Sequence, residues 1–266
     1  MPVFWRELAR TRVALAVWTL SLILFCVFLM TFFPTIREQA EELDELMAQY
    51  PPELVAAFNL DRLRMADPMG FYGAQVYLFI TLFGSIYAML LSVGVLAREE
   101  SERTSEFLLT RPLGRRRVVT EKALAALVDL TLFNTLFGLA NLVLFEIYAK
   151  GEYEHRILLL LILGPYLLHL FFWGVGLFLS VFVVKARAFY PLSIGVVLGL
   201  YFLSILSTLS DRAENLRYLT PFQYVDAADI VEDVRIAPVS LLVIGVVVVV
   251  CVTATYVFYQ RKDIAG

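Results

Sequence analysis

The sequence predicts an all-α membrane protein with six transmembrane helices, formed by a single transmembrane domain over residues 1–266. The 266 residues are 60% hydrophobic and have a mean hydropathy of +0.75, whereas soluble domains contain roughly 45–50% apolar residues. Charged residues make up only 18% and gather in a few stretches that separate long runs nearly free of charge. Because hydrocarbon excludes charge, such runs are typical of membrane-spanning helices. The composition therefore argues against a water-soluble fold.

Six apolar segments are long enough to cross a bilayer, which takes about 20 residues. They cover residues 13–33, 75–97, 123–149, 157–184, 189–209 and 239–259. A helix satisfies its own backbone hydrogen bonds in hydrocarbon, so each segment is predicted to be helical. The fourth contains Gly164-Pro165, and proline removes a backbone donor, so we expect a kink or a break there. The first is too long for a signal-peptide core and lacks a small-residue cleavage site, so we expect it to be retained.

Lys and Arg are distributed unevenly between the two sets of loops. With a cytoplasmic N-terminus, the inner segments hold 14 of the 22 basic residues, and the outer segments hold eight. Cytoplasmic loops carry the excess of basic residues. The sequence therefore predicts a multi-pass protein of the cytoplasmic membrane with both termini in the cytoplasm. The bilayer is an expected partner, and nucleic acid is not.

The two large outer loops, residues 34–74 and 210–238, contain short helical signals of their own. Apolar residues recur at helical spacing in the first loop, with acidic residues between them, and predict an amphipathic helix on the outer surface. These apolar residues are Ile36, Ala40, Leu43, Met47 and Tyr50. In the second loop, Thr220-Pro221 opens a segment from Phe222 to Val234. We expect this segment to be a re-entrant or interfacial helix before the sixth span.

The inner loop at residues 98–122, called the coupling loop below, carries the clearest functional signal. Arg98 with Glu102 and Glu99 with Arg103 place opposite charges at helical spacing, which favours a solvent-facing helix that continues out of the membrane. Pro112 would end this helix before a basic run. The alternative is a solvated linker whose arginines only set the topology of the chain.

The coupling loop resembles the cytoplasmic loop of ABC-2 type permeases, with acidic residues, a Thr, a Glu, a Leu pair, a Pro, an Arg and a Lys. The matching residues are Glu99, Glu100, Thr104, Glu106, Leu108, Leu109, Pro112, Arg115 and Lys122, while Arg103 stands where the family often has Gly. In that family the loop forms a coupling helix that docks on an ATP-binding subunit. The resemblance implies that the ATPase-coupling residues are Glu99, Glu100, Glu102, Arg103, Thr104, Glu106, Phe107, Leu108 and Arg115.

The resemblance extends to the layout of the whole chain and implies the permease of an ATP-driven exporter. Phe4, Trp5 and Leu8 lie in an N-terminal segment similar to the amphipathic elbow helix of the family. No Gly-x-x-x-x-Gly-Lys-Ser/Thr loop is present, so we expect no catalytic, cofactor or metal site in this chain. ATP and Mg²⁺ would bind to two copies of a separate ATP-binding subunit, and a second permease chain would complete a homodimer or close heterodimer.

Polar and small residues within the spans give weaker signals. Ser85 in the second span and Asn134 and Asn141 in the third are candidates for a substrate path, although hydrogen bonds between helices explain such residues equally well. His169 stands alone in the fourth span and is interpreted as a packing residue. Gly195 and Gly199 form a small-x-x-x-small pair in the fifth span and are candidates for a dimer contact. The resemblance places that contact around the first and fifth spans.

Two other classes of function stay open at the level of the sequence. Glu99-Glu100-x-x-Arg103 is similar to an element of membrane-embedded prenyl-protein endopeptidases, although its spacing is one residue short and a shared site with His169 would be required. A secondary transporter or an accessory membrane protein would need no ATPase. Cys26 and Cys251 both lie in apolar runs, so we expect no disulfide. Nothing in the sequence identifies the substrate.

Overall fold

Six long helices make up most of the computed structural model, which describes residues 2–47, 49–57, 60–101, 114–183, 188–209 and 211–261. Within these residues, six helices are long and apolar enough to cross a membrane. They are α1 (Pro2–Thr31), α6 (Tyr77–Ser101), α8 (Arg115–Tyr148), α9 (His155–Leu179), α10 (Phe189–Leu209) and α12 (Pro238–Arg261). The prediction of an all-α protein with six spans is confirmed.

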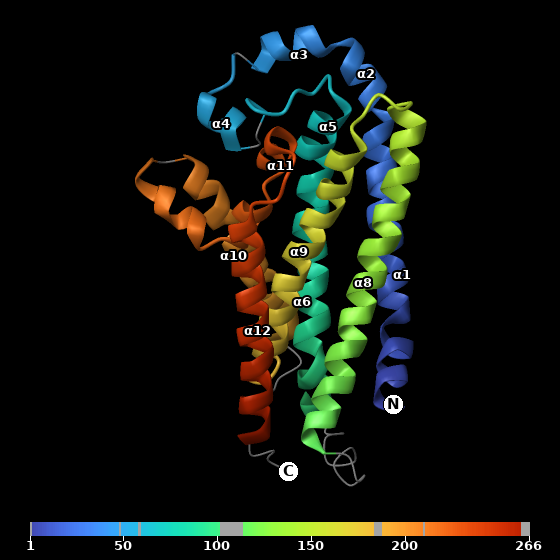
Figure 1. The fold of residues 1–266 in the computed structure, drawn as a ribbon, viewed down its shortest axis with the longest axis vertical. Coiled ribbons are helices and arrows are strands. Elements are labelled where there is room, and N and C mark those ends of the chain that lie inside the picture. The colour runs from blue at the N-terminus through green and yellow to red at the C-terminus, as the bar shows by residue number, and fades with distance from the viewer. Residues whose placement is uncertain are drawn as a thin grey trace.

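Short helices cover one end of this bundle, and both chain termini lie at the other end (Figure 1). The short elements are α2 (Phe33–Glu38), α3 (Ala40–Met47), α4 (Pro52–Ala57), α5 (Pro68–Phe71), η1 (Tyr72–Val76), η3 (Asp211–Tyr218), η4 (Pro221–Val225) and α11 (Ala227–Asp233). The amphipathic helix predicted for the first outer loop is split into α2 and α3 at Gln39. The segment predicted after Thr220-Pro221 consists of η4 and α11.

The central pair of the bundle is α6 and α9, against which α8, α10 and α12 pack. α12 packs on α9, α10 packs on α6, and α1 packs on α8. In the span that contains α6, 72% of the most apolar stretch is buried, against 17% in α10 and 11% in α12. A Cβ added to Gly176 of α9 would lie 2.8 Å from the Cβ of Ser92 on α6. Such small residues allow two helices to approach closely without a competing side chain.

Several predicted boundaries differ from the observed helices. α9 continues through Pro165 as one helix and ends at Leu179, so the predicted break is absent, because neighbouring helices in a membrane bundle can compensate for a missing backbone donor. α1 begins at Pro2 and is continuous through the first span, so a separate elbow helix is not confirmed. α6 extends to Ser101, and α8 begins at Arg115 rather than at residue 123. Both ends of the coupling loop are therefore helical.

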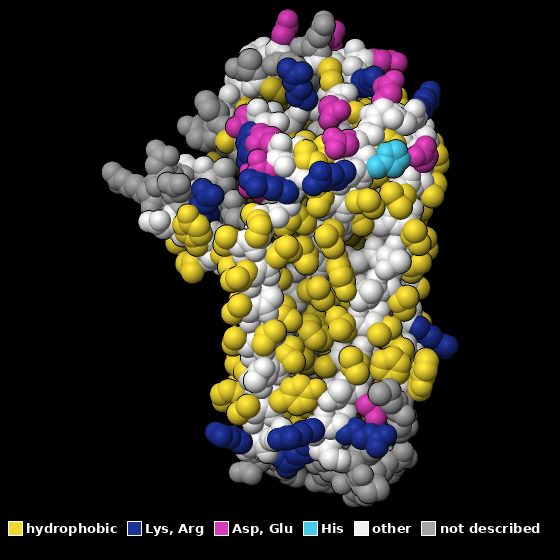
Figure 2. All heavy atoms as spheres, in the orientation of Figure 1, with side chains coloured by type: hydrophobic (Ala, Val, Ile, Leu, Met, Phe, Trp, Pro, Cys, Tyr) yellow, Lys and Arg dark blue, Asp and Glu magenta, His cyan; other side chains and the backbone are white. Residues whose placement is uncertain are grey.

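The surface divides into an apolar belt between two charged ends. Figure 2 shows hydrophobic side chains over the middle of the bundle, acidic side chains mainly at the end that carries α2 to α5, and Lys and Arg at both ends. A belt of this kind is what a bilayer requires of the helices that face it.

An ion-pair cluster, called the outer clamp below, joins the first outer loop to α11. The Arg62 guanidinium lies 2.8 Å from Oδ1 of Asp229 and 3.7 Å from Oδ1 of Asp226, and it also pairs with Glu232. Hydrogen bonding to Arg62 holds the pKa of Glu232 below its usual range. Asp226 in turn caps α11 by accepting hydrogen bonds from the backbone of Ala228 and Asp229. The clamp fixes two loops that are far apart in the sequence.

Candidate functional site

The structure places only part of the predicted ATPase-coupling set. Glu99 and Glu100 lie in the last turns of α6, and Arg115 opens α8, where its Nη1 donates to the carbonyl oxygen of Gln260 at 3.3 Å. The other predicted coupling residues lie outside the described part of the chain. They are Glu102, Arg103, Thr104, Glu106, Phe107 and Leu108. The end of α6 and the start of α8 lie at the same end of the bundle as the two termini (Figure 1).

A buried polar cluster, called the Lys122 junction below, connects the two ends of the coupling loop to α1. Lys122 on α8 is 1% exposed. Its Nζ donates to the carbonyl oxygen of Val95 on α6 at 2.6 Å and lies 3.4 Å from Oε1 of Glu7 on α1. A buried ammonium is costly unless it is paired and hydrogen-bonded, and here both conditions are met. One side chain thus joins three helices.

The neighbouring residue, Glu121, attaches the start of α1 to α8. Its Oε2 accepts hydrogen bonds from the backbone N–H groups of Val3 and Phe4 at 3.1 and 3.3 Å. Its Oε1 accepts from Nε of Arg117 at 2.8 Å. The first N–H groups of a helix have no partner within the helix, and they carry the positive end of its dipole. A carboxylate at this position therefore holds the N-terminus of α1 in place.

Two helical turns further into the bundle, Asp129 continues this polar seam. It is 1% exposed, and its carboxylate lies against the hydroxyl groups of Thr11 on α1 and Tyr87 on α6. Neither Glu7 nor Glu121 was predicted to be a site residue. Their position next to apolar runs was the available signal, but the contacts that tie them to another helix, Glu121 with Val3 and Glu7 with Lys122, join residues more than 100 positions apart in the sequence.

The polar residues proposed for a substrate path mainly connect helices. Oδ1 of Asn134 lies 2.9 Å from Nδ1 of His169, whose Nε2 lies 3.1 Å from the carbonyl oxygen of Ile80. Oδ1 of Asn141 accepts from Sγ of Cys26 on α1 at 3.3 Å. The structure thus shows interhelical hydrogen bonds for both asparagines. Asn134 also borders a groove of about 320 Å³ between α8 and α9.

Ser85 lies in the buried interface of α6, with no exposed surface. Within the described residues its Oγ has no hydrogen-bond partner. The neighbouring Gly84 is close enough to His169 that an added Cβ would lie 2.3 Å from the Cε1 of the imidazole ring. Gly84 thus packs directly against His169, and the place of Ser85 on a substrate path stays a prediction.

His169 and Glu99 do not share a site. The ring of His169 contacts α6 at Ile80, and Glu99 lies 19 residues further along the same helix. At about 1.5 Å of rise per residue this separation is roughly 28 Å. An endopeptidase mechanism that uses both groups is therefore incompatible with the fold.

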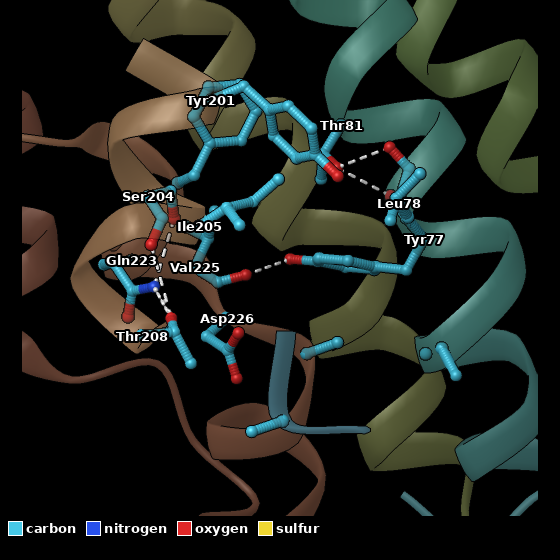
Figure 3. Close-up of a pocket in the computed structure, with 15 residues that line it drawn as sticks. Tyr77, Leu78, Thr81, Tyr201, Ser204, Ile205, Thr208, Gln223, Val225 and Asp226 are labelled. Atoms are coloured by element: carbon cyan, nitrogen blue, oxygen red, sulfur yellow. Dashed lines mark hydrogen bonds between the residues drawn. The ribbon is translucent and has the colours of Figure 1, made fainter. Parts of the chain in front are cut away.

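A small cavity of about 90 Å³ lies between α6, α10 and η4. The hydroxyl of Tyr77 donates to the carbonyl oxygen of Val225 at 2.6 Å, and Nε2 of Gln223 donates to Oγ of Ser204 at 3.0 Å. Figure 3 shows Tyr77 and Gln223 on opposite sides of this cavity. Ligand pockets usually enclose roughly 300–1,000 Å³. The cavity has room for a few water molecules and not for a drug-sized substrate.

Gly195 and Gly199 lie on an open face of α10. A Cβ added at either position would meet no atom within 4 Å. No other described part of this chain therefore packs against the two glycines, and their role in a dimer stays a prediction.

Comparison with known proteins agrees with the sequence pattern of the coupling loop. No curated protein and no solved structure matches the chain. The sequence does match a family model described as ABC-2 family transporter protein, over residues 1–264. This match covers all six spans and both ends of the coupling loop, so the resemblance inferred from residues 98–122 is confirmed. The chain therefore belongs to the ABC-2 family of transporter proteins, the membrane permease components of ABC transporters.

Proposed function

We propose that this chain is the permease subunit of an ATP-driven exporter and that two copies of it work with two separate ATP-binding subunits. The observation that carries the proposal is the Lys122 junction, which joins α6 and α8 to α1 at the base of the coupling loop. A force applied to the coupling loop would enter the membrane through α6 and α8. The Lys122 junction would then transmit this force to α1.

The mechanism assigns ATP hydrolysis to the partner and movement to this chain. ATP binding would close the pair of ATP-binding subunits and displace the coupling loop. Because α6 and α9 form the buried centre of the bundle, a displaced α6 would carry α9 with it. At the opposite end of the bundle, the outer clamp would hold α11 and the first outer loop together during this movement.

A pair of permease chains would meet along α10 and α1. The exposed apolar side chains of α10 include Ile194, Phe202 and Leu206, and those of α1 include Val17 and Leu24. The open surface at Gly195 and Gly199 allows a second backbone to approach. The translocation path would then form between the two chains, because the cavity described above is too small to hold a substrate.

The coupling role is tested by charge reversal at Glu102 and Glu106. The chain is co-expressed with the ATP-binding protein encoded beside it, and co-purification and ATPase activity are measured in reconstituted membranes. The pair of substitutions Glu102→Lys and Glu106→Lys should abolish co-purification or stimulation of the ATPase. The matched control is Glu38→Lys with Glu42→Lys, which has the same spacing among exposed residues at the other end of the bundle. Normal stimulation by the charge-reversed coupling loop would refute the proposal.

A secondary transporter is the second candidate, since Asp129, Glu7 and Lys122 are ionisable residues buried in or beside the spans. Such residues are common along ion pathways. The two candidates differ in their energy source. Transport by the purified chain alone, driven by an ion gradient and unaffected by ATP, would favour the secondary transporter.

A further inference from the structure

A groove of about 500 Å³ opens between the first turns of α8 and the last turns of α12. It lies at the end of the bundle that carries the termini. Its polar part is formed by Arg116, Gln260 and Arg261, and its apolar part by Val252, Tyr256 and Val257. The groove thus places two cationic side chains directly next to an apolar surface.

Two of the arginines around this groove, Arg116 and Arg261, have no acidic partner among the described residues. Arg115, Arg116 and Arg117 occupy the first turn of α8, where the helix dipole already contributes positive potential, and Gly114 provides no side-chain cap. Arg117 is paired with Glu121. Among the residues that the structure describes, neither Arg116 nor Arg261 has a carboxylate within ion-pair distance, and Nη2 of Arg116 donates to the neutral Oε1 of Gln260 at 3.3 Å. A bound anion would relieve this accumulation of charge.

The apolar side of the groove indicates what kind of anion fits. Val252 and Val257 continue into the exposed apolar surface of α12, which includes Val249 and Val250. The hydroxyl of Tyr256 lies 2.7 Å from Oγ1 of Thr120, and tyrosines of this kind are common where a membrane meets water. In Figure 2, Lys and Arg side chains form a row directly below the hydrophobic belt. The groove therefore spans the boundary between headgroups and acyl chains.

We propose that this groove binds an anionic phospholipid of the inner leaflet. Arg116 and Arg261 would bind the phosphate, and an acyl chain would lie along Val252 and Val257. Basic pockets between transmembrane helices on the cytoplasmic side recognise anionic lipids by this combination of charge and apolar contact. A soluble phosphate would use only the arginines and would bind more weakly. Because the site includes the first turn of α8, a bound lipid would also fix the helix that follows the coupling loop.

Lipid binding by the purified full chain in neutral detergent tests this proposal. Native mass spectrometry measures the affinity for phosphatidylglycerol, with phosphatidylcholine as the uncharged comparison. Each basic residue near an anionic headgroup contributes about a fivefold gain in affinity. The double substitution Arg116→Gln with Arg261→Gln should therefore weaken phosphatidylglycerol binding about 30-fold and leave phosphatidylcholine binding unchanged. Each single substitution should weaken it about fivefold.

Two controls separate this site from general attraction between charges. Lys150→Gln with Arg156→Gln removes the same charge from the other end of the bundle and should leave phosphatidylglycerol binding as it is in the natural chain. An unchanged thermal unfolding temperature without lipid shows that the variants fold. If the double variant does not fold, the two single substitutions provide the test. Equal affinity of the natural and double-substituted chains for phosphatidylglycerol would overturn the proposal. Binding of glycerol phosphate as tight as that of phosphatidylglycerol would overturn the assignment to a lipid.

Discussion

The Lys122 ammonium on α8 donates a hydrogen bond to the carbonyl oxygen of Val95 on α6 across 2.6 Å, and this bond joins the two helices that flank the coupling loop. The same ammonium lies 3.4 Å from the Glu7 carboxylate on α1. A movement that separated α6 from α8 would break the first contact, and a movement of α1 would break the second. The three helices are therefore held together at their base.

Replacing Lys122 with methionine should destabilise the chain, because the Glu7 carboxylate would lose its buried partner and keep only the half-exposed guanidinium of Arg6, at 3.7 Å. Removing one member of a buried ion pair lowers the free energy of unfolding by on the order of 3 kcal/mol. Thermal unfolding in detergent measures this loss. Glu7→Gln combined with Lys122→Met should recover part of it, since no unpaired charge remains. Arg12→Met, at an exposed position of α1, is the control and should have little effect. Equal losses in the single and double variants would contradict the pairing.

His169→Leu should weaken the contact among α6, α8 and α9. The substitution removes the imidazole that faces both Asn134 and the carbonyl oxygen of Ile80. A buried polar group left without its partner costs about 1–3 kcal/mol. The other histidine, His155, has a side chain that is 71% exposed, so His155→Leu is a matched control with little expected effect. Similar unfolding temperatures for the two variants would show that the His169 contacts do not stabilise the bundle.

The number of spans could be predicted from the sequence because it depends on composition alone. The start of α8 could not, because Glu121 and Lys122 interrupt the apolar run in the sequence. In the fold, Glu121 accepts hydrogen bonds from the start of α1 and Lys122 is paired with Glu7. These contacts allow two charged residues to be buried within a helix. Hydropathy measures each residue without its partners, so the predicted span began too late.

The residues of the coupling loop were predicted from a local pattern, whereas the Lys122 junction and the outer clamp depend on distant contacts. Arg62 meets Glu232 across 170 positions of sequence. No spacing rule within one helix relates such residues. For the same reason, Asn134 and Asn141 could be recognised as buried polar residues, but their partners His169 and Cys26 could not be assigned.

Arg62→Gln should raise the pKa of Glu232 towards the value of about 4.3 that is usual for Glu. In the natural chain this pKa is held low by the hydrogen bond to Arg62. The stabilisation from this pair is therefore present above the pKa of the unfolded chain and is lost as the pH falls through the lower pKa of the folded chain. NMR titration of ¹³C-labelled glutamate carboxylates measures the shift. Arg235→Gln is the control, because Arg235 pairs with Asp233 instead. An unchanged Glu232 pKa in Arg62→Gln would contradict the clamp.

Leucine at Gly195 and Gly199 should weaken the proposed pairing of two chains without disturbing the fold of either. Nothing within 4 Å would obstruct a Cβ at these positions, so the isolated chain should unfold at an unchanged temperature. In a dimer that meets along α10, the added side chains would keep the two backbones apart. A loss of tenfold in association corresponds to about 1.4 kcal/mol, which is a modest effect for two such side chains. Single-molecule photobleaching of labelled chains in membranes counts the dimers.

Gly245 on α12 provides the matched control for this experiment. Its added Cβ would also meet no atom within 4 Å, so Gly245→Leu alters the lipid-facing surface of a different helix to a similar degree. If pairing occurs along α10, Gly195→Leu with Gly199→Leu should lower the dimer fraction, and Gly245→Leu should leave it unchanged. A fall in both variants would indicate a general effect of surface leucines in the bilayer. An unchanged fraction in the α10 variant would exclude this face from the contact and direct attention to the exposed apolar side of α1, where Val17 and Leu24 lie.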